Sequence, residues 1–465
     1  MRDSGALGVD RPCSAIGSGG AGVMAADRSG SAPPRSARRS AVLASSVGTL
    51  LEYYDYYLFG LAAAVVFPAV FFPSADPLTG QLSSFATFAV GFVLRPVGGI
   101  VIGHLADRFG RKKALILTIV LMGTATILIG ALPGYRQIGV AAPILLVLLR
   151  LLQGFSTGGE MGGAISLAVE HAPPRKRGLY GALLLSGAGV ALLISSGLMA
   201  LFATLPDRDF LAWGWRIPFL LSFVLLVAGL IIRLRVGETP EFERARKKDA
   251  GARIPLVAVL RRPRNLLYGV LFGFANSIGG YVITTYGASY VKKDLGMPAS
   301  VALTATMVAA GAQIILAPTW GALSDRIGRK PVFLGGCLGL AVVIFPVFWL
   351  FETKNPVLVA VAMVLGFSVF VMAMSALSQT ILAELFDTRS RVTGVNLGYQ
   401  LTAVLGGGFA PYLSAWLVGA TGAVWGVGIY VIAGCVLSAI AMLLLPERAG
   451  QPLPEPAAEP KAATV

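Results

Sequence analysis

Five charged residues lie inside long apolar stretches in the first half of the chain: Glu52, Asp55, Arg95, Arg150 and Glu160. A charge near the centre of a bilayer costs roughly 2.5 to 3.5 kcal/mol, so such a residue usually faces a cavity or an oppositely charged partner. Carboxyl groups exchange protons, and guanidinium groups bind anions. These five residues are therefore the first candidates for chemistry.

The carboxyl pair is the feature best suited to proton binding. Glu52 and Asp55 are three residues apart, so they share a helix face and split each other's proton affinities. A neighbouring Arg150 keeps a carboxyl ionised, whereas the protonated form is favoured when the guanidinium turns to a bound anion or the site dries. We predict that Asp55 carries the proton with Arg150 as its partner, and that Glu52 is the second candidate. The alternative is that these residues only pair with one another to hold helices together.

A polar face runs along the apolar segment 141–169. Arg150, Gln153 and Glu160 follow the i, i+3, i+10 spacing of one helix face. Glu160 is surrounded by glycines in the sequence, which favours a helix-packing hydrogen bond for it over a functional role. Arg150 and Gln153 are expected to face the interior of the protein.

Substrate contacts are expected from both halves of the chain. Arg95 precedes Pro96, so its guanidinium binds either an anionic substrate or a backbone carbonyl that the proline leaves free. Residues 276–286 form a Gly-interrupted amphipathic stretch that suits a cavity wall and supplies uncharged hydrogen-bonding groups. Charge in one half and uncharged groups in the other fit a small polar metabolite. The candidate substrate-binding residues are Arg95, Tyr56, Gln153, Asn276, Tyr281, Gln379, Asn396 and Gln400.

The elements that position these residues are membrane-spanning helices. Apolar residues make up 55% of the 465 positions and charged ones 13%, about half the charged share of an ordinary soluble domain. A helix needs roughly 20 apolar residues to cross a hydrocarbon core of about 30 Å. Twelve such segments are predicted, which makes the fold all-α and integral to the membrane: 41–70, 84–106, 114–133, 141–169, 178–203, 214–234, 265–291, 299–323, 331–351, 357–383, 392–418 and 424–445.

Two charge patterns occur twice in the chain. The charged string at residues 103–113 recurs at 321–330, so that Asp107 is matched by Asp325, 218 residues further on. A second pattern, a Glu followed seven residues later by an Arg, occurs at residues 170–177 and again 214 residues further on, at 384–391. Two patterns at nearly the same offset indicate an internal duplication. Duplicated helical halves in a membrane protein are typical of a transporter, in which one bundle rocks against the other about a central site.

Basic residues predict the orientation in the membrane. The net charge is +15, and 30 of the 38 Lys and Arg residues fall on cytoplasmic segments when the N-terminus is placed in the cytoplasm, as the positive-inside bias requires. Nucleic-acid binding is therefore not expected. The predicted organisation is a disordered cytoplasmic tail over 1–40, a six-helix bundle over 41–234, a cytoplasmic loop over 235–264, a second six-helix bundle over 265–445 and a disordered cytoplasmic tail over 446–465.

The sequence carries no signature of an enzyme or of a cofactor. Cys13, Cys337 and Cys435 have neither metal-ligand nor disulfide-framework spacing. There is no metal-binding cluster, no nucleophile elbow and no phosphate loop. We expect no cofactor, no metal and no enzymatic activity.

The motifs together resemble the major facilitator superfamily. Besides the two repeated patterns, residues 52–60, 92–99, 150–160 and 213–219 are similar to its metabolite:proton symporter branch, and the resemblance covers nearly all of 41–445. It implies two pseudo-symmetric six-helix bundles, and it matches Asp55 and Arg150 to an acidic position and an Arg-x-x-Gln-Gly motif of that branch. It also implies a charge network that closes the cytoplasmic side, formed by Asp107, Arg108, Arg111, Glu170, Arg177, Asp325, Arg326, Arg329, Glu384 and Arg391.

The function that these features predict is proton-coupled import. The expected substrate is a small organic acid such as shikimate or a di- or tricarboxylate, carried by alternating access through a monomer in a bacterial inner membrane. The partners are then the small molecule, protons and the lipid bilayer. Proton symport of a zwitterion such as proline or betaine, and uncoupled facilitation, are the alternatives. Drug:proton antiport is disfavoured because residues 181–189 lack the Gly-Pro of that signature.

Overall fold

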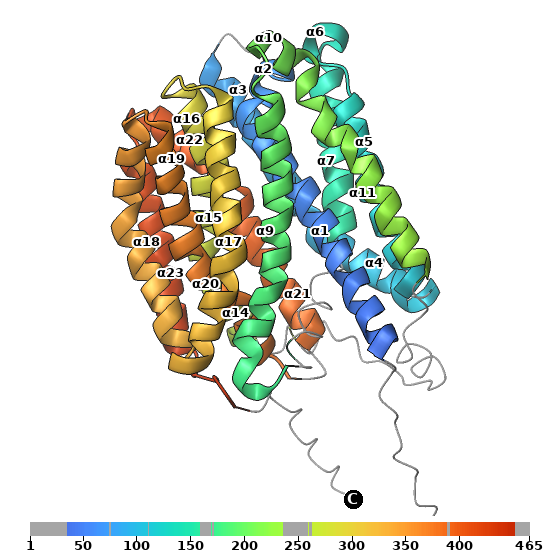
Figure 1. Ribbon diagram of the computed structural model, residues 1–465, viewed down its shortest axis with the longest axis vertical. Helices are drawn as coiled ribbons and strands as arrows, with labels where there is room; N and C mark the ends of the chain where they lie inside the picture. The colour runs from blue at the N-terminus through green and yellow to red at the C-terminus, as the bar shows by residue number, and fades with distance from the viewer. Residues whose placement is uncertain are drawn as a thin grey trace, which may run out of the picture.

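The computed structural model describes residues 35–73, 76–109, 111–158, 169, 172–235, 259, 263–387 and 391–451, with side chains over most of 50–451. Within these residues every regular element is a helix. Figure 1 shows the helices running between two faces. We call the face that holds the turn between α17 (Ala299–Ile327) and α18 (Arg329–Glu352) the lower face, and the opposite one, with α6 (Tyr135–Ile138) and α10 (Asp207–Asp209), the upper face. The last element, α23 (Trp425–Leu444), ends at the lower face.

The first half contributes six crossing segments. Asp76 caps the second of them, because its carboxylate accepts hydrogen bonds from the backbone nitrogens of Leu78 and Thr79 at 3.1 and 3.0 Å. The elements in order are α1 (Arg35–Val65), α2 (Phe67–Val70), α3 (Pro77–Val93), α4 (Arg95–Phe109), α5 (Arg111–Ala131), α6, α7 (Ala141–Thr157), the 3-10 turn η1 (Pro174–Lys176), α9 (Arg177–Phe202), α10, the π-helical turn η2 (Phe210–Gly214) and α11 (Arg216–Arg235).

The second half contributes six more, and three of them are interrupted by a π-helical stretch. Such stretches are rare and often mark functional positions. The elements are α14 (Pro263–Leu271), α15 (Phe274–Tyr281), the π-helical η3 (Val282–Tyr286), α16 (Gly287–Lys293), α17 (Ala299–Ile327), α18 (Arg329–Glu352), α19 (Pro356–Met363), the π-helical η4 (Val364–Val371), α20 (Met372–Leu385), α21 (Arg391–Thr402), the π-helical η5 (Ala403–Gly408), α22 (Ala410–Thr421) and α23.

These segments agree with the predicted fold class. Ten are long and apolar enough to cross a membrane, α7 is a shorter apolar helix of 17 residues, and α1 is a helix of 31 residues. The prediction of an all-α integral membrane protein with twelve crossing segments in two six-helix bundles is confirmed.

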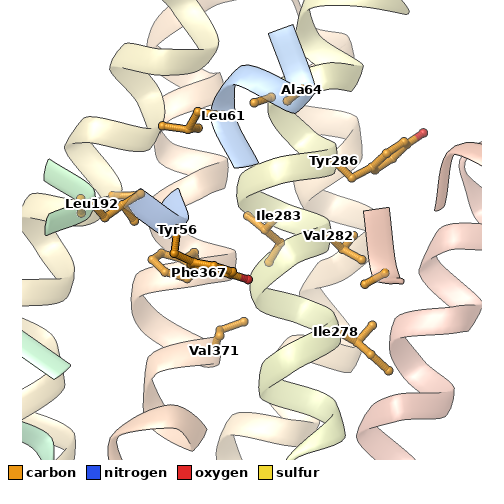
Figure 2. Packing of buried hydrophobic residues seen from close by; sticks show 14 of the residues in the cluster. Tyr56, Leu61, Ala64, Leu192, Ile278, Val282, Ile283, Tyr286, Phe367 and Val371 are labelled. Atoms are coloured by element: carbon orange, nitrogen blue, oxygen red, sulfur yellow. The ribbon is translucent and has the colours of Figure 1, made fainter. Parts of the chain in front are cut away.

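The two halves meet most extensively where α9 lies along α17, side by side in Figure 1. Glycines allow this approach: a β-carbon on Gly178 would lie 2.6 Å from the carbonyl oxygen of Gly321. Buried apolar side chains of both halves then form one continuous core. Figure 2 labels members of this core from both halves, among them Tyr56 and Leu192 of the first and Phe367 and Val371 of the second.

The chain ends differ from the predicted boundaries. Helix α1 begins at Arg35, inside the stretch predicted as a tail, because the helix extends below its apolar portion. Glu447 is also held in place: its carboxylate accepts hydrogen bonds from the backbone nitrogens of Arg329 and Lys330 at 3.1 and 2.9 Å. Residues 1–34 and 452–465 lie outside the described residues, as does most of the predicted loop 235–264.

Candidate functional site

A small cavity in the first half is surrounded by four ionisable side chains. Glu52 and Asp55 on α1 face Arg95 at the start of α4 and Arg150 on α7, and all four are at most 6% exposed. The volume of the cavity is about 10 Å³, close to the space that a single water molecule needs. The four charged residues that the sequence singled out on these three helices are therefore brought to one place.

Asp55 and Arg150 are neighbours within this group. The Asp55 carboxyl interacts with the Arg150 guanidinium and lies beside the Thr126 hydroxyl of α5. Arg150 donates from Nη1 to Gln153 Oε1 at 3.2 Å, and Gln153 Nε2 donates to Thr126 Oγ1 at 2.7 Å. This chain of contacts ties the acid, the guanidinium and the amide into one network.

Aromatic rings hold the guanidinium groups in place. The Arg150 Cζ lies 4.1 Å from the ring centroid of Phe59, and the Arg95 Cζ lies 4.5 Å from that of Phe92 and 4.9 Å from that of Tyr56. Such cation–π contacts stabilise a desolvated cation. The Nε and Nη2 atoms of Arg150 and the Nε of Arg95 have no hydrogen-bond partner within the described part of the chain, so both cations retain capacity for an anion or for water.

Glycines in the crossing helices set this geometry. A β-carbon on Gly154 of α7 would lie 1.8 Å from the carbonyl oxygen of Gly91 on α3, and one on Gly158 would lie 2.0 Å from that of Arg95. The helices therefore pack backbone to backbone, as small residues allow in membranes. This close crossing places Arg95 and Arg150 on the same side of α1.

A larger cavity lies between the two halves and has a volume of about 90 Å³. Tyr53 and Tyr57 of α1 form one wall, and residues of the second half form most of the remainder. No charged side chain lines it among the described residues. Its polar lining residues are Asn276, Ser277, Thr284, Gln313, Ser375, Ser378, Gln379, Thr402 and the tyrosines Tyr53, Tyr57, Tyr281 and Tyr399.

Three carboxamide side chains of this cavity have unused acceptor atoms. The Nε2 of Gln313 donates to the Leu185 carbonyl at 3.2 Å, so this hydrogen bond does not involve the Oε1 of the same side chain. Gln313 Oε1, Gln379 Oε1 and Asn276 Oδ1 are buried and have no hydrogen-bond partner within the described residues. Buried acceptors of this kind are costly unless a ligand or water donates to them.

The predicted substrate contacts are thus divided between different places. Asn276, Tyr281 and Gln379 line the larger cavity, whereas Tyr56, Arg95 and Gln153 line the smaller one. Asn396 and Gln400 line neither: their amide nitrogens donate to the carbonyl oxygen of Gly158 at 2.9 and 3.4 Å. In this conformation these two residues join α21 of the second half to the end of α7 in the first half.

The charge pattern of the second half forms a buried cluster at the lower face. Arg329 Nη1 pairs with Asp325 Oδ1 at 2.7 Å, and Arg329 Nη2 lies 3.5 Å from Glu384 Oε1. Asp325 also accepts hydrogen bonds from two backbone nitrogens at the start of α9, in the other half. Arg177 interacts electrostatically with Glu384 and donates to the Gln451 carbonyl at 2.6 Å.

Other members of the predicted network are placed differently. Arg391 is buried and donates to the Ala383 carbonyl at 3.1 Å, which ties α21 to the end of α20. Arg326 is exposed and forms no ion pair with a described residue. The side chains of Asp107, Arg108, Arg111, Glu160 and Glu170 lie outside the described residues.

Several residues that contact the predicted site residues were not predicted from the sequence. Thr126 of α5 and Ser222 of α11 both lie beside the Asp55 carboxyl. A hydroxyl on an otherwise apolar helix was the available signal for both residues. The sequence does not show that these faces of α5 and α11 meet α1, because that depends on how the helices pack. Glu447 was missed because nothing in the local sequence relates it to residue 329.

The comparisons with known proteins agree with the fold and the motifs. The family model for the Major Facilitator Superfamily matches residues 45–400 and 314–465. The chain belongs to the major facilitator superfamily. Its relatives include the shikimate transporter of Escherichia coli (strain K12), which is 39% identical over 412 residues, covering 88% of this chain and 94% of the relative.

Two further relatives and one solved structure are similar to this chain over most of its length. Inner membrane metabolite transport protein YhjE of Escherichia coli (strain K12) is 38% identical over 90% of this chain and 97% of its own. The proline/betaine transporter of Salmonella typhimurium is 32% identical over 89% of this chain and 85% of its own. The xylose transporter XylE from E. coli, in a partially occluded inward open conformation, superposes with a TM-score of 0.71 at 18% identity, covering 90% of this chain and all of XylE, which shows the shared fold.

Membership of this superfamily makes the chain a multi-pass membrane transporter of small molecules and not an enzyme. The resemblance stated from the sequence motifs is confirmed. The described residues contain no group of three or more side chains that could hold a metal ion.

Proposed function

We propose that this transporter is a proton symporter that imports a small hydroxylated organic acid. The observation that carries the proposal is the cavity bounded by Glu52, Asp55, Arg95 and Arg150 next to a larger uncharged one. Two buried acids with two buried cations balance in charge. Adding a proton and an anion together preserves that balance, whereas adding either alone buries a net charge, which is costly.

Asp55 is the proposed proton carrier. Its carboxylate is stabilised by Arg150 and by neighbouring hydroxyls. When the Arg150 guanidinium turns its unpartnered Nε and Nη2 atoms toward a bound anion, the carboxylate loses its counter-charge and takes up a proton. The proton and the anion then bind and leave together, which is the condition for symport. Glu52 is the second candidate for this role.

The larger cavity favours a substrate that donates hydrogen bonds. The free acceptor atoms of Asn276, Gln313 and Gln379 would be satisfied by hydroxyl groups, which donate hydrogen bonds, whereas a second carboxylate has no donor to offer them. A hydroxylated monocarboxylic acid presents an anion to the arginines and hydroxyls to the amides. The 39% identity to a protein named shikimate transporter supports this class over di- and tricarboxylates.

The lower face is the proposed cytoplasmic side of a bacterial inner membrane, with both chain termini on it. The positive-inside bias supports this orientation, because 30 of the 38 basic residues then fall on cytoplasmic segments. In an alternating-access cycle the Asp325, Arg329 and Glu384 cluster would hold the lower face closed and would separate when the site opens inward. We propose that one monomer performs this cycle.

A second candidate substrate is a zwitterion with a quaternary ammonium group. The aromatic rings of Tyr53, Tyr57, Tyr281, Phe367 and Tyr399 line the larger cavity, and aromatic faces bind such cations. The relative named proline/betaine transporter supports this class. The two candidates differ in electrical behaviour, because a monoanion with one proton carries no net charge and a zwitterion with one proton carries one.

The test is uptake of radiolabelled solutes into proteoliposomes under an imposed pH gradient. Shikimate and quinate, succinate and citrate, and proline and glycine betaine represent the three classes. The proposal predicts accumulation of a hydroxylated monoacid that responds to pH but not to a potassium diffusion potential. Accumulation of a betaine that also responds to voltage would favour the zwitterion. Equal uptake with and without the pH gradient would indicate uncoupled facilitation and contradict the proposal.

A further inference from the structure

Tyr56 lies directly between the two cavities. On one side its ring centroid is 4.9 Å from the Arg95 Cζ and 5.9 Å from the Arg150 Cζ. On the other side it is 5.5 Å from the ring centroid of Tyr57 and 5.6 Å from that of Tyr281. Tyr57 and Tyr281 line the larger cavity, and the two cavities share no lining residue. Tyr56 therefore separates the charged group from the space where a solute would bind.

A single layer of aromatic rings separates the two cavities. Phe88 and Phe92 complete it, with ring centroids 5.7 and 5.3 Å from that of Tyr56. In Figure 2, Tyr56 projects from α1 toward the helix that carries Ile278 and Ile283. Its hydroxyl is buried and has no hydrogen-bond partner among the described residues. A buried hydroxyl without a partner is costly, so this side chain gains a hydrogen bond when it turns toward a solute or toward water.

From this geometry we infer that Tyr56 is a positioning residue for coupling: its ring seals the Asp55–Arg150 pocket from the larger cavity until a bound solute displaces it. The inference rests on the proposed proton symport. A symporter must not carry protons when its solute is absent. With the ring in place, Asp55 exchanges protons with cavity water slowly; when a solute draws the hydroxyl toward itself, the anion reaches Arg150 and Asp55 takes up its proton from the same water.

The decisive variant is Tyr56→Leu, compared with Tyr56→Phe. Leucine lacks the flat ring and leaves the layer open, whereas phenylalanine keeps the ring and removes only the hydroxyl. Met372→Ala serves as the contrast, because Met372 lines the larger cavity, does not line the smaller one and is not one of the rings that contact Tyr56. Its expected defect is in solute uptake alone.

The measurement is proton entry into proteoliposomes without any solute, followed with an internal pH dye under a potassium diffusion potential. We expect Tyr56→Leu to raise the protein-dependent proton flux about tenfold over wild type, since it removes the cation–π and aromatic contacts that hold the layer closed. Tyr56→Phe and Met372→Ala should stay within about twofold of wild type. A proton flux through the Tyr56→Leu protein equal to that of wild type would overturn the inference.

A second measurement tests directly whether a water-soluble reagent can reach Asp55. A water-soluble carbodiimide modifies exposed protonated carboxyl groups, and mass spectrometry quantifies the modified fraction at Asp55. Asp55 should be protected in wild type and Tyr56→Phe and modified in Tyr56→Leu; equal modification in all three would contradict the inference. If the leucine variant does not fold, Tyr56→Met, a flexible apolar replacement, is measured with the same expectations. Both experiments omit solute, so their outcome is separate from whether a pH gradient drives uptake by the wild-type protein.

Discussion

Asp325 Oδ1 accepts a hydrogen bond from the backbone nitrogen of Gly178 at 2.9 Å, across the boundary between the two halves. Its Oδ2 accepts another from Leu179 at 2.9 Å. The carboxylate therefore occupies the N-terminal end of α9, where the helix dipole favours a negative charge. Because the helix end and the carboxylate belong to different bundles, the proposed opening of the lower face would break this contact.

Replacing this carboxylate should weaken closure of the lower face. Asp325→Asn retains an acceptor but loses the charge that faces α9 and Arg329, which we expect to cost the closed state about 1 to 2 kcal/mol. The measurement is the maleimide-labelling rate of a cysteine placed at Ser375, in the larger cavity, with reagent supplied at the lower face. The rate should rise about five- to thirtyfold.

The matched control is Arg326→Gln, which removes an exposed neighbouring charge without an ion pair to a described residue. It should leave the labelling rate unchanged. Equal rates in Asp325→Asn and Arg326→Gln would show that the carboxylate does not bias the equilibrium.

Arg150→Lys should impair transport although the charge is kept. Lysine cannot stack a planar group over Phe59 at the 4.1 Å seen for Arg150 while also donating to Gln153. We expect the initial rate of pH-driven uptake to fall by at least about tenfold, since one charge-assisted hydrogen bond and one cation–π contact are lost. Binding of solute, measured by thermal-shift titration, should weaken in parallel. Wild-type uptake by Arg150→Lys would show that a positive charge alone suffices.

Gly154→Ala should destabilise the whole protein. Its β-carbon would lie 1.8 Å from the Gly91 carbonyl oxygen, so α3 and α7 must separate, at a cost of about 1 to 3 kcal/mol. The check is the thermal unfolding midpoint in detergent. Gly187→Ala on α9, where a β-carbon meets no atom within 4 Å, is the control and should leave the midpoint unchanged or raise it. Similar midpoints for the two variants would contradict the close crossing.

Glu447 should stabilise the lower face in a pH-dependent way. Burial acts to raise its pKa, but the backbone N–H groups of Lys330, Arg329 and Ala449 outweigh this and hold the pKa below its usual 4.5. A lowered folded-state pKa means that the stabilisation is present above pH 4.5 and is lost as the pH falls through the folded value. Glu447→Gln should therefore lower the unfolding midpoint at pH 7, and its difference from wild type should shrink as the pH falls below 4.5. A difference that does not shrink as the pH is lowered below 4.5 would exclude the carboxylate as its cause.

The sequence predicts the fold well because the signals that define it are local. Apolar length marks the crossing helices, and the spacing of Glu52 and Asp55, or of Arg150 and Gln153, gives the helix face that each pair occupies. That these faces converge was expected from the cost of burying charge, and the structure places them around one cavity.

The features that the sequence did not reveal depend on contacts between distant segments. Asn396 and Gln400 have the side chains of substrate ligands but bond to the Gly158 carbonyl, which spacing along α21 does not indicate. The separation of the arginines from the larger cavity by Tyr56 likewise depends on how α1 is rotated between the two halves. Periodicity places Tyr56 on a face of α1 but does not say which cavity that face borders.

The most direct test of proton coupling through Asp55 compares two activities of Asp55→Asn in proteoliposomes: accumulation driven by a pH gradient, and exchange of labelled for unlabelled solute at equal pH. Asparagine keeps the size of the side chain and cannot take up the proton. We predict that accumulation is abolished while exchange persists. Accumulation at the wild-type level by Asp55→Asn would contradict it.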